Sequence, residues 1–149
     1  MAGDSDTDDP RNLGRFVQAQ EADYERALAE IRAGEKRSHW MWYIFPQLDG
    51  LGSSSMARMY AIKTVAEAKA FLRHPILGSR LRQIMDATLQ IQGRSAQAIF
   101  GSTDERKLRS CATLFAGLSP AGSVFELVLD KYFQGLRDRR TLELMEVDS

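Results

Sequence analysis

The chain has 149 residues, a length that favours one domain built around a single hydrophobic core. Hydrophobic residues make up 44% and charged residues 27%, which is typical of a globular protein and argues against disorder of the whole chain. Lysine plus arginine equals aspartate plus glutamate at 20 each, so net charge gives no reason to expect a nucleic acid or a membrane as a partner.

The first ten residues carry four aspartates and no basic residue. We therefore expect residues 1–12 to form a disordered acidic tail and residues 13–149 to form a single helical domain. The tail lacks the positive and apolar segments of a secretory signal, and no stretch reaches the roughly 18 apolar residues that span a bilayer. These features predict a cytoplasmic protein.

Helical periodicity accounts for the first half of the remaining chain. Apolar residues at helical spacing predict a helix over residues 23–33, preceded by a turn or short helix that includes Leu13 and Phe16. A capping box over residues 64–67 opens a further helix. Pro75 separates that helix from a longer one, which ends before Gly93.

The second half of the chain repeats these helix signals. Two more capping boxes, at residues 102–105 and 123–126, begin two helices, and residues 141–145 form a last short one. No segment alternates apolar and polar residues convincingly, so strands have little support. The sequence predicts an all-α fold, a compact single-domain bundle of about six to eight short helices.

Metal and thiol chemistry have little support. His39 and His74 are the two histidines, and neither has a second ligand at the spacing that places two donors on one helical face. We therefore expect no metal and no cofactor. Cys111, the single cysteine, shares an apolar stripe with Leu108 and Phe115, so we interpret it as a small buried hydrophobe.

The stretch EKRSHWMWYIFPQLDGLG, residues 35–52, places cations beside aromatic side chains. If residues 38–45 are helical, both sides of the helix are apolar, which predicts a buried central helix. Arg37, Ser38 and His39 then stand at its start, where a cation opposes the helix dipole by roughly 0.3 to 1 kcal/mol. Carboxylates of this chain or an external anion could compensate, and both alternatives stay open.

Two further segments could join such an anion site. One side of the helix after residue 102 carries Arg106, Arg109, Ser110 and Thr113, which form either a solvated face or a surface for an oxyanion. The glycine and serine loop over residues 50–55 leads into a predicted helical segment, residues 56–62. Its serines either cap that segment or help to bind an anion.

Three motifs carry a resemblance to a known family: KRSHWMWYIFPQLDGLGSSSMARMYAI, HPILGSRL and IFGSTDERKLRSCATLF. Together they resemble the bacterial family called domain of unknown function 1810, over most of residues 16–144. The resemblance implies a compact, partly armadillo-like helical fold and no established activity. Cys111 departs from the family pattern, and the calpastatin-like label that such proteins sometimes carry finds no support in these residues.

The first functional hypothesis is a pocket for a small anionic ligand, phosphate-bearing or nucleotide-like, near the RSHWMW helix start. Its ligand-binding residues would be Arg37, Ser38, His39, Trp40, Trp42, Gln47, Lys107, Arg109 and Ser110. Whether the protein is an enzyme stays open. If it is one, His39 would be the general acid or base and Asp104 its partner carboxylate.

The alternative is a protein–protein interaction module without catalysis. Convergence of His39, Gln47 and Arg109 in one concave pocket would favour the ligand hypothesis, whereas their separation beside an exposed apolar groove would favour the module. Binding of nucleic acid would require Trp40 and Trp42 at the surface, and the density of aromatic residues argues against that.

Overall fold

The computed structural model describes residues 9–148 of the chain. Within that range the chain forms nine helices and no strand, so the all-α prediction is confirmed. The helices are α2 (Gly14–Arg32), α3 (Met41–Ile44), α4 (Ser55–Met59), α5 (Val65–Arg73), α6 (Leu77–Gln90), α7 (Ala96–Phe100), α8 (Ser102–Ala116), α9 (Val124–Phe133) and α10 (Arg139–Asp148). The disordered tail was predicted for residues 1–12, and residues 1–8 of it lie outside the described residues.

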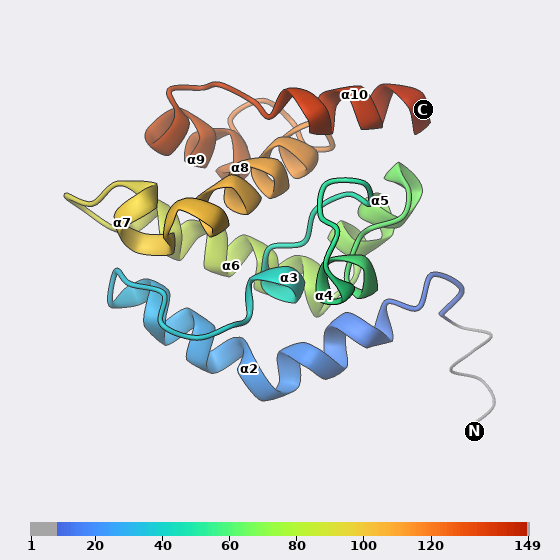
Figure 1. Cartoon of the computed structure of the whole chain (residues 1–149), viewed down its shortest axis with the longest axis horizontal. Coiled ribbons are helices and arrows are strands. Elements are labelled where there is room, and N and C mark those ends of the chain that lie inside the picture. Colours follow the sequence, from blue (N-terminus) through green and yellow to red (C-terminus); the bar gives the residue numbers. More distant parts are fainter. Residues whose placement is uncertain (1–8, 149) are drawn as a thin grey trace.

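Helices α6 and α8 form the middle of the molecule. Figure 1 shows α2 on one side, α10 on the opposite side, and α6 and α8 between them. Helix α6 packs against α2, α5 and α9, and α8 packs against α7, α9 and α10. Across residues 9–148, no helix combines the length and the apolar character that crossing a membrane requires.

A series of aromatic contacts runs through the core. Phe16, Phe71, Phe115 and Phe125 follow one another with ring centroids 5.1, 5.7 and 5.6 Å apart. These side chains come from α2, α5, α8 and α9, and each is at most 1% exposed. Because buried aromatic rings contribute large apolar areas, this series joins the first and last thirds of the chain in one core.

Helix α2 is longer than the sequence analysis predicted. It begins at Gly14, so the helix predicted over residues 23–33 is only its later part, and the turn or short helix predicted before it belongs to the same helix from Gly14 onward. Residues 18–22 contain no glycine or proline that would interrupt a helix. Asp9 accepts hydrogen bonds of 2.7 Å from the backbone N–H groups of Leu13 and Gly14. Residues 9–12, predicted as tail, therefore form a turn attached to the domain.

The predicted central helix is shorter than expected but buried as expected. Helix α3 covers Met41–Ile44 instead of residues 38–45, and Ser38 does not cap it. Trp40 and Phe45 are 0% exposed, whereas Trp42 is only partly buried. One aromatic side chain of the segment is therefore accessible at the surface.

Two of the three predicted capping boxes form helix caps. Thr64 Oγ1 accepts from Glu67 N at 3.0 Å, and Ser123 Oγ accepts from Glu126 N at 3.3 Å. The third box begins α8 at the predicted place, but Gly101 is the N-cap residue and Ser102 is already helical. Gly101 has φ +87°, a conformation that glycine adopts without strain, so the chain turns there without a side-chain cap.

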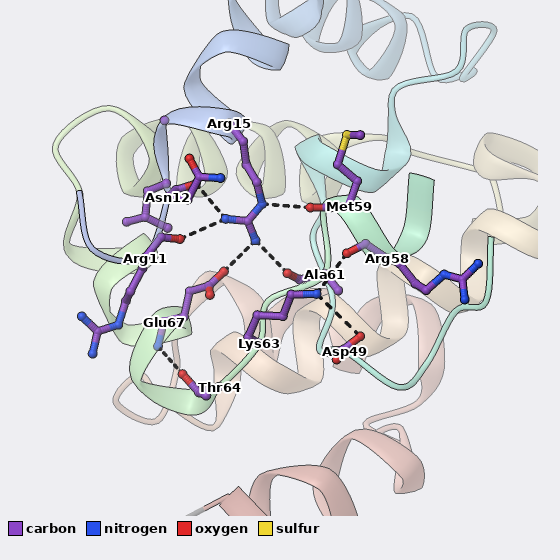
Figure 2. Close-up of polar contacts among 12 residues, drawn as sticks. Arg11, Asn12, Arg15, Asp49, Arg58, Met59, Ala61, Lys63, Thr64 and Glu67 are labelled. Carbon is purple, nitrogen blue, oxygen red and sulfur yellow. Dashed lines mark hydrogen bonds and ion pairs between the residues drawn. The ribbon is translucent and has the colours of Figure 1, made fainter. Parts of the chain in front are cut away.

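Arg15 ties the start of α2 to the segment between α4 and α5. Its Nε donates to Met59 O at 2.9 Å, and its Nη2 donates to Ala61 O at 2.8 Å. Nη2 also pairs with Glu67 Oε2 at 2.9 Å, and the Glu67 side chain is only 5% exposed (Figure 2). Since a shielded carboxylate needs a partner, Arg15 supports both the loop and the start of α5.

Replacing Arg15 should destabilise the fold strongly. We expect Arg15→Ala to lower the free energy of unfolding by about 3 to 5 kcal/mol, because it leaves a buried carboxylate unpaired. Arg15→Lys should recover only part of this loss, since one ammonium cannot reproduce the guanidinium fork. Urea unfolding followed by circular dichroism measures both changes.

Arg11→Ala is the matched control for this experiment. Arg11 is exposed, and within residues 9–148 its side chain makes no hydrogen bond or ion pair. We expect its replacement to change stability by no more than about 0.5 kcal/mol. Equal losses in the Arg11 and Arg15 variants would contradict the role assigned to Arg15.

Candidate functional site

The carboxylate of Glu30 occupies the cationic turn that precedes α3. Its Oε1 accepts from Arg37 N at 2.8 Å, Ser38 N at 3.0 Å and Trp40 Nε1 at 2.9 Å, and its Oε2 accepts from Ser38 Oγ at 2.6 Å. Burial acts to raise the pKa of Glu30, but these four hydrogen bonds outweigh it and hold the pKa below its usual value. The carboxylate that compensates this cationic turn therefore comes from this chain.

A second internal carboxylate, Asp104, pairs with two lysines. Its Oδ2 lies 2.8 Å from Lys36 Nζ, and its Oδ1 lies 3.1 Å from Lys107 Nζ. Burial acts to raise the pKa of Asp104, but the hydrogen bonds and charges of both lysines outweigh it and lower the pKa. Asp104 consequently links the segment before α3 to α8.

His39 and Asp104, the candidates for acid–base catalysis, are not joined in the structure. His39 is exposed, and within the described range the Asp104 carboxylate bonds to the two lysines and not to the imidazole. Arg37 is also exposed, with Nη2 3.4 Å from Glu35 Oε1. Arg37 and His39 thus face solvent, and the backbone N–H groups of Arg37 and Ser38 are already bonded to Glu30.

Four of the predicted ligand-binding residues line one cleft. Trp42, Gln47, Lys107 and Ser110 contribute to a cleft of about 530 Å³, which we name the Trp42–Lys107 cleft. Its other lining residues are Leu51, Gly52, Ser53, Ser54, Ala57, Thr103, Arg106, Asp138 and Arg140. The cleft is thus shared by the segment around α3, the loop before α4, helix α8 and the start of α10.

The charged residues of the Trp42–Lys107 cleft are three cations and one carboxylate. Lys107 is paired with Asp104, and Arg140 Nη1 lies 3.6 Å from Glu143 Oε1. Arg106 is exposed and makes no hydrogen bond or ion pair with any residue of the described chain. Arg106 is therefore the cation of the cleft that has no ion-pair partner within the described chain.

Backbone pairing holds Gln47 in place. Ile62 N donates to Gln47 O at 2.9 Å, and Asp49 N donates to Ile62 O at 2.8 Å, which forms an isolated parallel bridge. A Cβ atom at Gly52 would lie 2.6 Å from Ala57 Cβ and 3.4 Å from Gln47 Nε2. A side chain at Gly52 would therefore displace its neighbours in the cleft wall.

The serine loop caps the helix that follows it. Ser54 Oγ accepts from Ala57 N at 3.1 Å and begins α4, which covers Ser55–Met59 rather than the predicted residues 56–62. The capping role that the sequence left as one alternative is confirmed for Ser54. Ser53 and Ser54 also line the cleft, so the two alternatives do not exclude each other.

The polar face of α8 binds the segment before α10. Arg109 donates from Nε to Leu136 O at 2.9 Å and from Nη2 to Arg137 O at 3.0 Å. Ser110 Oγ donates to Asp138 Oδ2 at 3.3 Å. This face is therefore neither simply solvated nor wholly free for a ligand, because Arg109 bonds carbonyl groups of the chain and does not line the Trp42–Lys107 cleft.

The remaining residues with potential chemistry have structural roles. His74 Nδ1 accepts from the N–H groups of Ile76 and Leu77 at 3.1 and 3.2 Å and supports the start of α6. Cys111 is buried, and burial raises the pKa of its thiol. Throughout residues 9–148, no three His, Cys, Asp or Glu side chains come together as metal ligands would.

Sequence reasoning missed Asp138 and Arg140 as cleft residues. Both stand at the start of α10, far along the chain from Trp42 and Gln47. Asp138 is placed in the cleft by its hydrogen bonds to α8. Ser110 Oγ donates to its carboxylate, and Thr113 Oγ1 accepts from Asp138 N at 2.9 Å. That contact is long-range and cannot be derived from periodicity.

The fold and the cleft together define a compact all-helical protein with a cationic cleft between α8, the start of α10 and the loop before α4. Residues 10–145 match the family model described as protein of unknown function (DUF1810). The chain belongs to this family, as the resemblance of its motifs predicted.

A solved structure supports this assignment. The crystal structure of the conserved hypothetical protein Rv1873 from Mycobacterium tuberculosis is similar, with 48% sequence identity and a TM-score of 0.90. The match covers 92% of this chain and 98% of that chain. A search of curated proteins found no match.

Replacing Glu30 should make stability less dependent on pH in the acidic range. The folded-state pKa lies below the usual value of 4.5, so Glu30 stabilises the fold above about that pH and loses the effect as pH falls through the lowered pKa. We expect Glu30→Gln to cost about 1 to 3 kcal/mol near neutral pH, from the weakened hydrogen bonds. Urea unfolding at a series of pH values measures the difference from the native chain.

The difference between native chain and variant should shrink toward zero on acidification. Glu25→Gln is the matched control, because Glu25 is an exposed residue of the same helix. A Glu30→Gln cost that stays constant as pH falls through the acidic range would show that the charge of Glu30 does not contribute.

Proposed function

We propose that the Trp42–Lys107 cleft binds a small anionic, phosphate-bearing ligand. The observation that carries the proposal is the unpaired guanidinium of Arg106, which lines the cleft together with Lys107 and Arg140. An arginine fork can donate two parallel hydrogen bonds to one oxyanion. Small-molecule sites are typically concave and contain a few polar groups of this kind.

Other groups of the cleft support the same ligand class. The hydroxyls of Ser53, Ser54 and Thr103 can donate to further phosphate oxygens. Lys107 Nζ lies 5.9 Å from the centroid of the Trp42 ring, so a cation and an aromatic surface stand side by side. The proposal keeps Trp42, Gln47, Lys107 and Ser110 from the residues predicted by sequence. It leaves out Arg37, Ser38, His39, Trp40 and Arg109.

Inorganic phosphate should stabilise the protein through Arg106. A ligand that binds only the folded state raises the thermal midpoint in proportion to the logarithm of its concentration. We expect Arg106→Ala to weaken the phosphate affinity obtained from this shift by about tenfold or more, since hydrogen bonds to charged groups contribute roughly 1.5 to 3 kcal/mol. Thermal unfolding in phosphate and in chloride of equal ionic strength measures the effect.

Arg73→Ala is the matched control for charge. Arg73 is an exposed residue at the end of α5, and it does not line the Trp42–Lys107 cleft. We expect this variant to respond to phosphate as the native chain does. If all three proteins respond equally, or if chloride acts like phosphate, the proposed site is wrong.

A second candidate function is a protein–protein interaction module. His39 and Arg109 do not line the cleft that contains Gln47, and an apolar groove of about 940 Å³ lies between α5 and α10. Its apolar lining residues are Val65, Leu118, Pro120, Leu142 and Met145, of which Leu142 is 40% exposed, and Lys69, Ser119 and Glu146 line its polar part. Exposed apolar side chains in a groove are a feature of protein-binding surfaces.

Leu142→Lys tests this second candidate without touching the anion site. We expect affinity purification to recover a stoichiometric partner with the native chain and to lose it with Leu142→Lys, because a charge would enter the apolar groove. Thermal stabilisation by phosphate should be the same in both. Recovery of no stoichiometric partner, or of the same partner by both proteins, would contradict the interaction module.

A further inference from the structure

We infer that the ligand of the Trp42–Lys107 cleft is a phosphorylated pentose, free or as part of a mononucleotide, whose hydroxyl groups bind to Asp138 and Gln47. This inference rests on the proposed anion site and names the class of its ligand. It comes from the groups of the cleft that a simple anion would leave unused.

One oxygen of the Asp138 carboxylate has no internal partner. Oδ2 accepts from Ser110 Oγ at 3.3 Å and from Thr141 N at 2.9 Å, and it accepts from Thr141 Oγ1 as well. Oδ1 makes no hydrogen bond within the described part of the chain, although Asp138 lines the cleft. A free carboxylate oxygen repels a phosphate group but accepts a strong hydrogen bond from a hydroxyl. Asp138 therefore favours a ligand that carries hydroxyls beside its anionic group.

The side-chain amide of Gln47 is a second unused group. Its backbone carbonyl is bonded to Ile62, but its amide has no hydrogen-bond partner among residues 9–148. The residue is partly buried, and its Nε2 lies 3.4 Å from the place where a Cβ of Gly52 would stand. An amide offers both donors and an acceptor, which matches a hydroxyl that donates and accepts at once. Gln47 can therefore bind a hydroxyl of the same ligand as Asp138.

Trp42 provides the apolar surface that such a ligand needs. The side chain is partly buried and lines the cleft, and its indole N–H makes no hydrogen bond with the described residues. An aromatic face can pack against the C–H face of a sugar ring or stack on a base. The cleft thus contains cations, hydroxyl-binding groups and an aromatic surface together.

The charge of the cleft favours one phosphate group over several. Lys107 shares Asp104 with Lys36, and Arg140 lies 3.6 Å from Glu143, so Arg106 is the cation of the cleft that has no ion-pair partner within the described chain. A phosphate monoester carries about −1.5 to −2 charges near neutral pH. A polyphosphate would add further negative charge to a cleft that already contains the Asp138 carboxylate. The geometry therefore points to a monophosphate.

Calorimetric titration of the full chain with three compounds tests this inference. The probes are inorganic phosphate, ribose 5-phosphate and adenosine 5′-monophosphate. We expect ribose 5-phosphate to bind at least about tenfold more tightly than phosphate, because it adds hydrogen bonds to a charged group. If adenosine 5′-monophosphate binds more tightly than ribose 5-phosphate and Trp42→Leu removes that difference, the ligand is a nucleotide. If the two compounds bind with equal affinity, the ligand is a sugar phosphate.

Asp138→Asn separates a binding role from a structural one. Asparagine retains a side-chain oxygen for the start of α10 but removes the charge. We expect phosphate to bind this variant as well as the native chain or more tightly, whereas ribose 5-phosphate loses its advantage. An equal loss of affinity for both compounds would mean that Asp138 acts only through the fold, and it would overturn the inference.

Gln47→Met is the second variant, and Gln97→Met is its control. Methionine has a similar volume and removes an amide that makes no internal hydrogen bond, so the fold should be retained. We expect ribose 5-phosphate to bind several-fold more weakly to Gln47→Met and phosphate to bind unchanged. Gln97 is exposed on α7 outside the cleft, and its replacement should alter neither affinity.

The results also separate this inference from the proposed function. Phosphate binding that depends on Arg106, with ribose 5-phosphate no tighter, overturns the pentose phosphate and leaves the anion site in place. Binding of none of the three compounds overturns both.

Discussion

The carboxylate of Glu30 determines how the chain passes from α2 into the core. A single side chain at the end of α2 accepts from two backbone N–H groups, one hydroxyl and one indole, all between Arg37 and Trp40. Without it, these donors would require water or an ion, since unpaired donors near a core are costly. The turn that results buries Trp40 completely and leaves Trp42 at the wall of the cleft. The position of the aromatic cleft residue therefore depends on an acid twelve residues earlier in the chain.

Local patterns predicted most of the helices and much of the core. The caps at Thr64 and Ser123 involve partners three residues away, so the sequence contains all the information that they need. Phe71 and Phe115 are buried because helical spacing places them on apolar stripes. The beginning of α2 was missed because the apolar periodicity is weak over residues 18–22. Weak periodicity does not interrupt a helix when its residues all favour that conformation.

The candidate site was predicted only in part because charge partners are set by tertiary structure. Trp42, Gln47, Lys107 and Ser110 do meet in one cleft, although helical spacing alone could relate only the last two. Arg109 looks like an anion-binding arginine in sequence, but its guanidinium bonds to carbonyl groups near residue 136, well beyond the range of any local pattern. Counting cations on a helix cannot distinguish an arginine that binds a loop from one that remains available.

The cations of this protein differ in how many internal bonds an external ligand would have to replace. An anion that bound Arg15 would have to replace Glu67 and four carbonyl groups, and one that bound Lys36 would compete with Asp104 at a position only 8% exposed. Each exchange would sacrifice internal bonds that are strong because they are shielded from water. Arg106 has no such bond within residues 9–148 and stands in a concave wall. Of Arg15, Lys36 and Arg106, an external anion would therefore meet the smallest internal competition at Arg106. Arg11 also lacks an internal partner among the described residues but does not line this cleft, so availability together with a concave wall is the reason that we propose a binding site at Arg106.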